Sequence, residues 1–139
     1  MQTAKLVGGV LLGLLVGVGV GWLLGASGRD DVDRVVQAAQ LRSYLLQARG
    51  SALAARVDIY NVNFGDASRD LETAKGALRR ATDLLKTAAR TDEATQVAAA
   101  LTQLDEAQQM GGRLDQGANA RTAAAVKTID GVLETAAAR

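Results

Sequence analysis

None of the 139 residues of this chain is proline. Proline lacks a backbone N–H and clashes with the preceding helical turn, so it ends or kinks helices wherever it occurs in their interior. Alanine, the best helix former, is the commonest residue, and aromatic residues make up only 3% of the chain. Few β-branched or aromatic runs remain from which a sheet could be built. We therefore predict an all-α fold made of long helices.

Histidine and cysteine are also absent. Their absence excludes disulfides, thiolate zinc sites, iron–sulfur clusters, histidine-ligated pigments and any Ser–His or Cys–His catalytic pair. The 16 Lys and Arg residues balance the 15 Asp and Glu residues, which gives no basic footprint for nucleic acid. No catalytic constellation can be assembled from what remains. We expect no enzyme activity, no cofactor, no metal site and no nucleic-acid partner.

One segment, Leu6–Leu24, contains no charged residue. Nineteen helical residues span about 28 Å, close to the thickness of the hydrocarbon core of a bilayer. Trp22 and Lys5 stand near its two ends as candidate interface anchors. A cleaved signal peptide is the alternative, but its apolar region is usually shorter, about 7–15 residues. We expect an uncleaved transmembrane helix over residues 6–25, after a short flank at residues 1–5.

Five glycines recur at every fourth position of this segment: Gly9, Gly13, Gly17, Gly21 and Gly25. Positions four apart lie on one slowly winding face of a helix. Small residues let membrane helices approach closely, where no hydrophobic effect drives them together. The row predicts a packing face for another membrane helix, which could belong to a second copy or to a different protein. Glycine is also simply common in membrane helices, which is the alternative explanation.

Residues 26–34 form the expected juxtamembrane linker, and residues 35–139 the expected extramembrane domain. Lys5 precedes the apolar segment, whereas Arg29 and Arg34 follow it. The positive-inside rule slightly favours a cytoplasmic domain, but a basic start before a long apolar run resembles a signal anchor. We expect a bacterial inner or intracytoplasmic membrane protein with a periplasmic domain, and leave the cytoplasmic orientation open.

Beyond the linker, apolar residues follow a heptad spacing, which indicates helix. One column contains Val36, Ser43, Gly50, Val57, Phe64, Leu71, Leu78 and Leu85. The other contains Val32, Ala39, Leu46, Leu53, Tyr60, Ala67, Ala74, Ala81 and Ala88. The columns predict which residues form the core, including the aromatic residues Tyr44, Tyr60 and Phe64 on or near them.

The segment Asn61-Val62-Asn63-Phe64-Gly65-Asp66 interrupts this pattern with turn-forming residues. Gly65 tolerates a positive φ and Asp66 can cap the next helix, so we predict a hairpin here. Over about residues 40–80 the chain resembles the helical hairpin of a tetratricopeptide repeat, through Tyr60, Phe64-Gly65-Asp66-Ala67, Leu71 and Ala74. The Trp-Leu-Gly part of that family's pattern and its closing proline are missing, so the resemblance does not extend to a peptide-binding groove.

Three further helices are expected. The second of the bundle should run from about Asp66 to Arg90, and Thr91, with Asp92 and Glu93 behind it, should cap a third. The third should end near Gly111-Gly112, or continue to Leu114 and break at residues 115–117. The fourth should cover about Ala118 to Ala138. The prediction is two hairpins, arranged as a bundle of four helices or as a short tetratricopeptide-like stack, with a thin, alanine-rich core.

Two charged groups are candidate contact surfaces. Five basic residues, Lys75, Arg79, Arg80, Lys86 and Arg90, would form a docking face on the second helix for an acidic subunit or lipid headgroups. Glu72 and Asp83 lie three residues before two of them and can pair with them. Asp30, Asp31 and Asp33 could contact a cation or a basic partner. A solvated helix face is the alternative explanation for the basic group, and a helix N-terminus that favours acids is the alternative for the acidic group.

The layout of one anchor and a small helical domain resembles that of accessory subunits of large bioenergetic membrane complexes, such as photosynthetic reaction-centre–antenna or respiratory complexes. This resemblance implies a non-catalytic assembly subunit whose partners are other transmembrane subunits and the lipid bilayer. Two hypotheses stand beside it. One is a membrane-tethered adaptor that recruits a soluble partner, and the other is a homo-oligomer formed through the glycine face.

Overall fold

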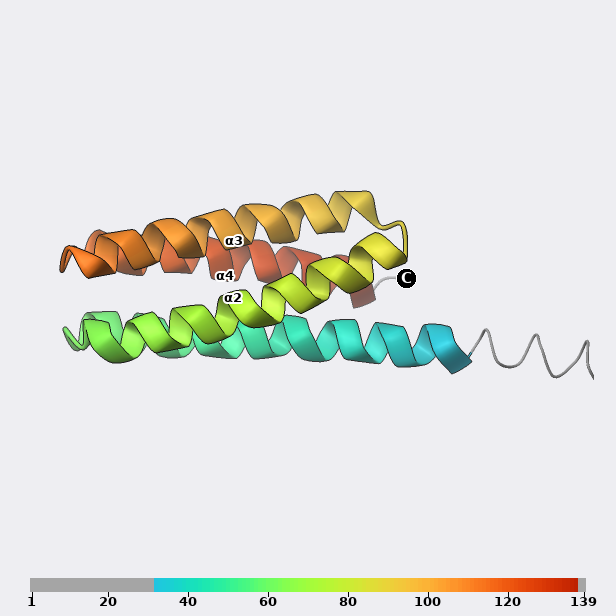
Figure 1. Cartoon of the computed structure of the whole chain (residues 1–139), viewed down its shortest axis with the longest axis horizontal. Coiled ribbons are helices and arrows are strands. Elements are labelled where there is room, and N and C mark those ends of the chain that lie inside the picture. Colours follow the sequence, from blue (N-terminus) through green and yellow to red (C-terminus); the bar gives the residue numbers. More distant parts are fainter. Residues whose placement is uncertain (1–31, 138–139) are drawn as a thin grey trace, which may run out of the picture. The chain divides into compact units, whose positions relative to one another are not determined.

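The computed structural model describes residues 32–137, which form four helices and three short turns without a strand among them. The chain is helical from residue 32 to residue 60. It continues as α2 (Phe64–Thr87), α3 (Thr91–Gly112) and α4 (Gly117–Ala137). Figure 1 shows consecutive helices running in opposite directions, as two hairpins. The predicted all-α class and the helical bundle are confirmed for this part of the chain.

The contacts within the chain divide it into two units, residues 1–37 and residues 38–139. The packing of helices described below is that of the second unit. No helix between residues 32 and 137 is both long and apolar enough to cross a bilayer. The predicted transmembrane segment, the glycine row within it and most of the linker lie outside the described residues.

The second unit closes into a bundle because each helix contacts two others. The helix at residues 32–60 packs beside α2, and α3 packs against both α2 and α4. Arg49 of the 32–60 helix donates to Asp130 of α4 at 2.6 Å, and Arg56 donates to Asn119 of α4 at 3.1 Å. The Asn119 amide donates in turn to the backbone carbonyl of Arg56 at 2.9 Å. These bonds join the first described helix to the last.

Every helix presents buried residues with alternating spacings of four and three. In the 32–60 helix they are Leu41, Leu45, Ala48, Ala52, Ala55 and Ile59, which we call the inner seam. The matching sets are Ala67, Leu71, Ala74, Leu78, Ala81 and Leu85 in α2, Glu93, Val97, Ala100, Leu104 and Ala107 in α3, and Ala118, Thr122, Ala125, Ile129 and Val132 in α4. A 3.5-residue repeat keeps one face of each helix toward its neighbours, as in coiled coils.

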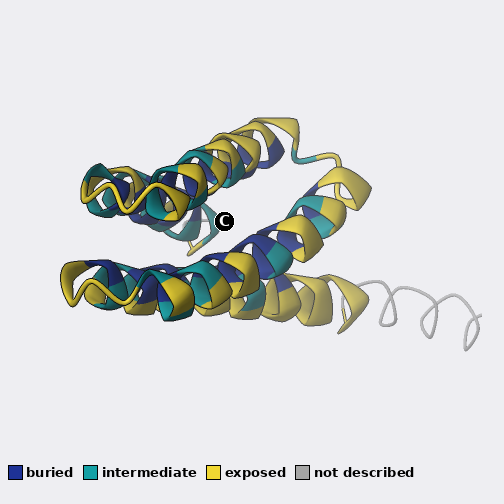
Figure 2. Cartoon of the chain, turned by 60° about the vertical axis from the view of Figure 1, so that its left-hand side comes forward, coloured by how far each residue is buried: buried dark blue, intermediate teal, exposed yellow. Residues whose placement is uncertain are grey.

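Alanine supplies more than half of the buried apolar residues in the described part. Alanine lets helices approach closely, but it removes little apolar area from water for each residue buried. Figure 2 shows the buried stripe of each helix turned toward the others. The core is therefore thin, and its few large side chains, such as Leu45, Leu78, Leu104 and Ile129, contribute most of the apolar burial.

All three turns share one geometry, the Schellman motif. In the first, the Val62 N–H donates to Ile59 and the Asn63 N–H to Asp58, at 3.0 and 2.8 Å. Ala89 and Leu114 occupy the place of Val62 in the other two turns. All three have positive φ values, 62°, 55° and 56°, and none is glycine. The prediction that Gly65 supplies the positive φ was wrong, because Gly65 lies inside α2.

The helix boundaries match the predictions to within a few residues, but the caps differ. Asn63, rather than Asp66, caps α2, and its side chain accepts from the Asp66 N–H at 3.4 Å. Arg90, rather than Thr91, is the N-cap of α3, because the Schellman turn before it uses Ala88 to Arg90. The helix α3 ends at Gly112, as the first of the two predicted alternatives has it.

The predicted core was right for α2 and wrong for most of the 32–60 helix. Leu71, Leu78 and Leu85 are buried as expected. Most column members of the first helix are exposed, Tyr60 by 80%, whereas the column member Leu53 and the nearby Tyr44 are partly buried and pack against the core. The reason is that the turn at residues 61–63 shifts the heptad register. A column that lies on the outer face of the 32–60 helix therefore lies on the inner face of α2.

Candidate functional site

Most of the residues predicted to contact the membrane or a cation are outside the described part of the chain. These are Gly9, Gly13, Gly17, Gly21, Gly25, Lys5, Trp22, Asp30 and Asp31. Asp33 lies on the 32–60 helix and is exposed. Within residues 32–137, no three acidic side chains gather in a way that could hold a metal ion.

The predicted basic docking face loses one member, because Lys75 is buried. Its side chain is only 5% exposed and reaches from α2 to α3. The ammonium group lies 2.7 Å from Glu72 and 2.8 Å from Asp105. It also donates to Gln108, whose amide donates to Ser68 at 3.0 Å. Lys75 is therefore part of a polar cluster between α2 and α3, and the prediction that it faces a partner was wrong.

The electrostatics of this cluster keep Lys75 charged. Burial disfavours its charged form, but the hydrogen bonds and charges of Asp105 and Glu72 outweigh that effect and raise its pKa. The hydrogen bonds of Glu72 with Lys75 and then Gln108 lower the pKa of Glu72. The expected pairing of Glu72 with Lys75 is thus confirmed. No corresponding ion pair joins Asp83 to Lys86 in the described structure.

Arg90 belongs to the turn between α2 and α3 rather than to the docking face. Its guanidinium lies 2.8 Å from Glu93, whose side chain is 3% exposed at a core position of α3. The three remaining basic residues, Arg79, Arg80 and Lys86, are exposed on α2. Arg80 lies 5.7 Å from the ring centre of Tyr44, a cation–π contact between α2 and the 32–60 helix.

A second charged contact joins the same two helices. Partial burial and the neighbouring carboxyl of Asp58 raise the pKa of Asp70. Two neighbouring carboxyl groups repel each other when both are ionised, which makes the proton of Asp70 harder to remove. A third carboxylate or a histidine, which a metal site would need, is missing from this pair.

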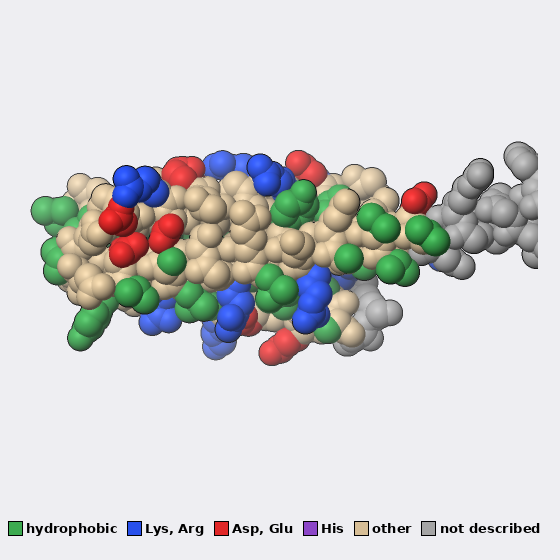
Figure 3. Space-filling view, turned by 90° about the horizontal axis from the view of Figure 1, so that it is seen from below, with side chains coloured by type: hydrophobic (Ala, Val, Ile, Leu, Met, Phe, Trp, Pro, Cys, Tyr) green, Lys and Arg blue, Asp and Glu red, His purple; other side chains and the backbone are tan. Residues whose placement is uncertain are grey.

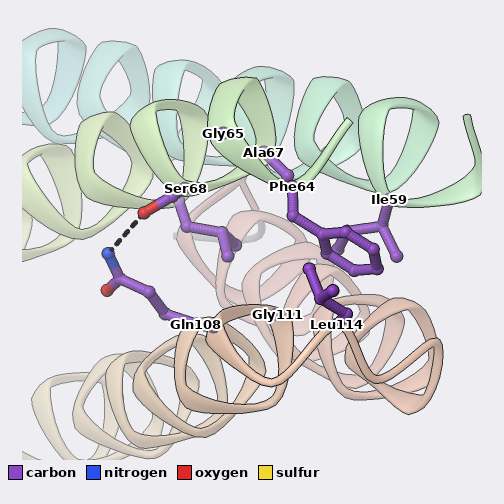
Figure 4. Close-up of a pocket in the computed structure, with 10 residues that line it drawn as sticks. Ile59, Phe64, Gly65, Ala67, Ser68, Gln108, Gly111 and Leu114 are labelled. Atoms are coloured by element: carbon purple, nitrogen blue, oxygen red, sulfur yellow. Dashed lines mark hydrogen bonds between the residues drawn. The ribbon is translucent and has the colours of Figure 1, made fainter. Parts of the chain in front are cut away.

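An apolar pocket of about 260 Å³ opens at one end of the bundle. Ile59, Phe64 and Leu114 face one another across it (Figure 4), and Gly111 and Gly112 also line it. The only hydrogen bond across it in this view joins Gln108 to Ser68. None of the residues that line the pocket is charged, and its one hydroxyl group, that of Ser68, accepts a hydrogen bond from Gln108.

A row of apolar and small side chains, most of them exposed, lies on the 32–60 helix, on the side opposite its inner seam. It consists of Ala39, Ser43, Leu46, Gly50, Leu53, Val57 and Tyr60, which we call the outer seam. Leu46, Val57 and Tyr60 are 46%, 59% and 80% exposed. Figure 3 looks at this side, where apolar side chains run along the molecule between charged borders.

The spacing of the outer seam is that of a coiled coil. Its members follow one another at alternating intervals of four and three residues, and the sequence continues the spacing upstream to Val36 and Val32. A helix that carries one apolar heptad toward its own bundle needs no second one for stability. A second, exposed heptad on the same helix is typical of a surface that binds another helix.

The sequence contained this surface, but its pattern was assigned to the core. Both the inner and the outer seam are heptads, so periodicity alone does not say which one is buried. The signal that could have found the outer seam is the presence of two apolar heptads on one helix.

Comparisons with known proteins assign neither a family nor a function to this chain. Searches against protein-family models, curated proteins and solved structures find no match for this chain. The tetratricopeptide-like hairpin and the resemblance to accessory subunits therefore stay predictions from the sequence.

Proposed function

We propose that this protein is a non-catalytic assembly subunit of a larger membrane complex. Its glycine-rich segment inserts beside other transmembrane helices, and its helical bundle binds a further helix outside the bilayer. The observation that carries the proposal is the outer seam, which is exposed except at Leu53 and lies on a helix that already buries its core-facing heptad. An enzyme would instead need side chains that converge on a reacting atom.

The chemistry of the surface fits binding better than catalysis. Within the described residues, no group of three acidic side chains that could hold a metal ion lies beside Leu46, Val57 or Tyr60. Exposed apolar side chains in a row lose water when a partner helix covers them, and that loss drives association. Small residues between them, such as Gly50, let the partner approach closely.

A native gel tests the proposal. Membranes are extracted with a mild detergent, and the wild-type protein is compared with the Leu46→Glu and Val57→Glu variants. Ala99→Glu, an exposed position on α3, is the matched control. We expect the wild type and the control to run in a large band of fixed composition and the two seam variants to leave it. Migration of the wild type as a single chain would contradict the proposal.

The membrane segment is tested in the same assay. Replacing Gly13, Gly17 and Gly21 by leucine adds bulk only where helices pack closely. We expect this variant to leave the large band as well. If the glycine variant stays assembled, the segment serves only as an anchor.

The alternative of a tethered adaptor for a soluble partner is favoured by the apolar pocket at the end of the bundle. An adaptor would keep its partner when its membrane segment is exchanged for an unrelated anchor, whereas an assembly subunit would lose its place in the complex. The exchange therefore separates the two functions.

A further inference from the structure

We propose that the apolar pocket at the end of the bundle binds a small, uncharged aromatic molecule of up to two fused rings. The pocket shares no residue with the outer seam. The inference therefore goes beyond the proposed function and does not depend on it. It follows from the packing around the pocket, from the residues at the end of α3, and from the volume and the lining.

The pocket lies where two clusters of buried side chains meet. A small cluster at this end of the bundle consists of Ile59, Ala67 and Ala118, and it is separate from the large cluster along the rest of the bundle. Ile59 and Ala67 line the pocket, and so does Leu71 of the large cluster. Protein interiors contain few voids larger than a water molecule. An opening of about 260 Å³ between two clusters is therefore an exception to the dense packing of the bundle.

Two glycines line the pocket from the last turn of α3. Neither Gly111 nor Gly112 has a positive φ, so the backbone does not require glycine at these positions. An added side-chain carbon at Gly111 would lie 3.5 Å from Cδ1 of Phe64, an ordinary contact, and one at Gly112 would meet nothing within 4 Å. The packing of the single chain does not require glycine either, although glycine weakens a helix. Glycine does allow a ligand to approach the backbone closely.

Leu114 shows the opposite arrangement. Its φ of 56° lies in the left-handed region, where glycine is the residue that fits best. Its side chain nevertheless faces Phe64 and Ile59 across the pocket (Figure 4) and is 70% exposed. The chain thus carries glycine where a helix favours a side chain, and leucine where the turn favours glycine. A ligand that contacts Gly111 and covers Leu114 explains both choices.

The volume and the charge of the lining define the chemical class of the ligand. An apolar cavity of about 150 Å³ holds one benzene molecule. A pocket of about 260 Å³ therefore has room for two fused rings. None of the lining residues is charged, and an ion that enters such a site loses its hydration without gaining an opposite charge.

The polar and aromatic lining residues narrow the class further. The side chain of Gln108 accepts from Lys75 and donates to Ser68, so the polar groups on this wall already bond within the protein. Phe64 presents its ring to the pocket (Figure 4). Pairs of aromatic rings attract each other beyond the effect of the area that they bury. The lining therefore favours an aromatic ligand over an aliphatic one.

Quinoline, which has two fused rings and is uncharged at neutral pH, is the probe for this site. It is titrated into the full-length protein in mild detergent, and the backbone amide signals of Gly111 and Gly112 are followed by nuclear magnetic resonance. We expect both signals to move with a dissociation constant below about 1 mM, as is usual for a ligand of about ten atoms. N-methylquinolinium has the same rings and a permanent charge, and we expect it to bind about tenfold more weakly or worse.

Two variants distinguish a binding site from a fault in packing. Gly111→Leu extends a side chain toward Phe64, and we expect it to abolish quinoline binding without lowering the melting temperature. Leu114→Gly suits the positive φ and removes one wall of the pocket. We expect it to bind about threefold more weakly or worse, at an unchanged or higher melting temperature. Gly131→Ala on α4, where an added carbon meets nothing within 4 Å, is the matched control and should bind like the wild type.

Three results would overturn the inference. The first is that the Gly111 and Gly112 signals do not move at millimolar quinoline. The second is that N-methylquinolinium binds as tightly as quinoline, which would contradict the uncharged class. The third is that octanol binds as tightly as quinoline, which would show that the pocket accepts any apolar chain. Each of these results leaves the native gel of Leu46→Glu unaffected, so the proposed function is judged separately.

Discussion

Two neighbouring leucines test the fold of the 32–60 helix, because they lie on opposite faces. Leu45 is fully buried in the inner seam, whereas Leu46 is 46% exposed in the outer seam. The substitutions Leu45→Ala and Leu46→Ala remove the same atoms and change helix propensity equally. Any difference between the two variants therefore reports which face is buried.

The structure gives the magnitude of that difference. Removing a buried leucine side chain costs its transfer free energy and leaves a cavity, together about 3 kcal/mol for Leu45. Leu46 keeps nearly half of its surface in water, so its removal should cost about 1 kcal/mol. The expected gap in the free energy of unfolding is about 2 kcal/mol. With a urea dependence of about 1.5 kcal/mol per molar, the midpoints should differ by about 1.3 M.

The assay is urea unfolding of the full chain in mild detergent, followed by circular dichroism at low protein concentration. Dilution matters because a helix bound to the outer seam would cover Leu46 and raise the cost of its loss. Equal midpoints, or a larger loss for Leu46→Ala, would refute the assignment of the inner seam. They would show that the column containing Leu46 forms the core, as the sequence pattern suggested.

Three further predictions concern the cluster around Lys75 and the first turn. Lys75→Met should change the free energy of unfolding by less than about 1 kcal/mol, because the methionine side chain has a similar shape and the former ion-pair partners stay half-exposed. Lys75→Ala should cost about 2 kcal/mol through lost packing. The urea midpoints of both variants measure these changes, and a severe loss of stability for Lys75→Met would contradict the prediction. Val62→Asn should raise the stability by about 1 kcal/mol, because asparagine tolerates the positive φ better than a β-branched residue, and an unchanged or lower melting temperature would count against the turn geometry. The pKa of Glu72 is held below its ordinary value of 4.5, so its contribution to stability is present above that pH and is lost as the pH falls through the lowered value. Glu72→Gln should therefore lose less stability than the wild type between pH 6 and pH 3, and parallel pH profiles would disprove the role of this carboxylate.

The sequence predicted the helices of the second hairpin well, because their ends carry local signals. Asp92 and Glu93 occupy the first turn of α3, and Gly111 and Gly112 end it. Local composition determines such boundaries, so no knowledge of the neighbouring helices is needed.

The features that the sequence missed depend on contacts between distant residues. Lys75 is buried because Asp105 and Gln108, 30 and 33 residues away, receive its ammonium group. The 32–60 helix carries two apolar heptads, and its packing against α2 and α4 determines which of the two is buried. The residue pattern of one helix alone does not predict which of its faces the neighbouring helices cover.

The alanine-rich core also determines how the bundle responds to temperature. The heat capacity of unfolding grows with the apolar area that becomes exposed, and alanine exposes little. The stability curve of this bundle should therefore be flatter than that of a leucine-rich bundle of equal length. Its free energy of unfolding should change little between cold and warm conditions, so that cooling should weaken the bundle less than it would a protein with a large hydrophobic core.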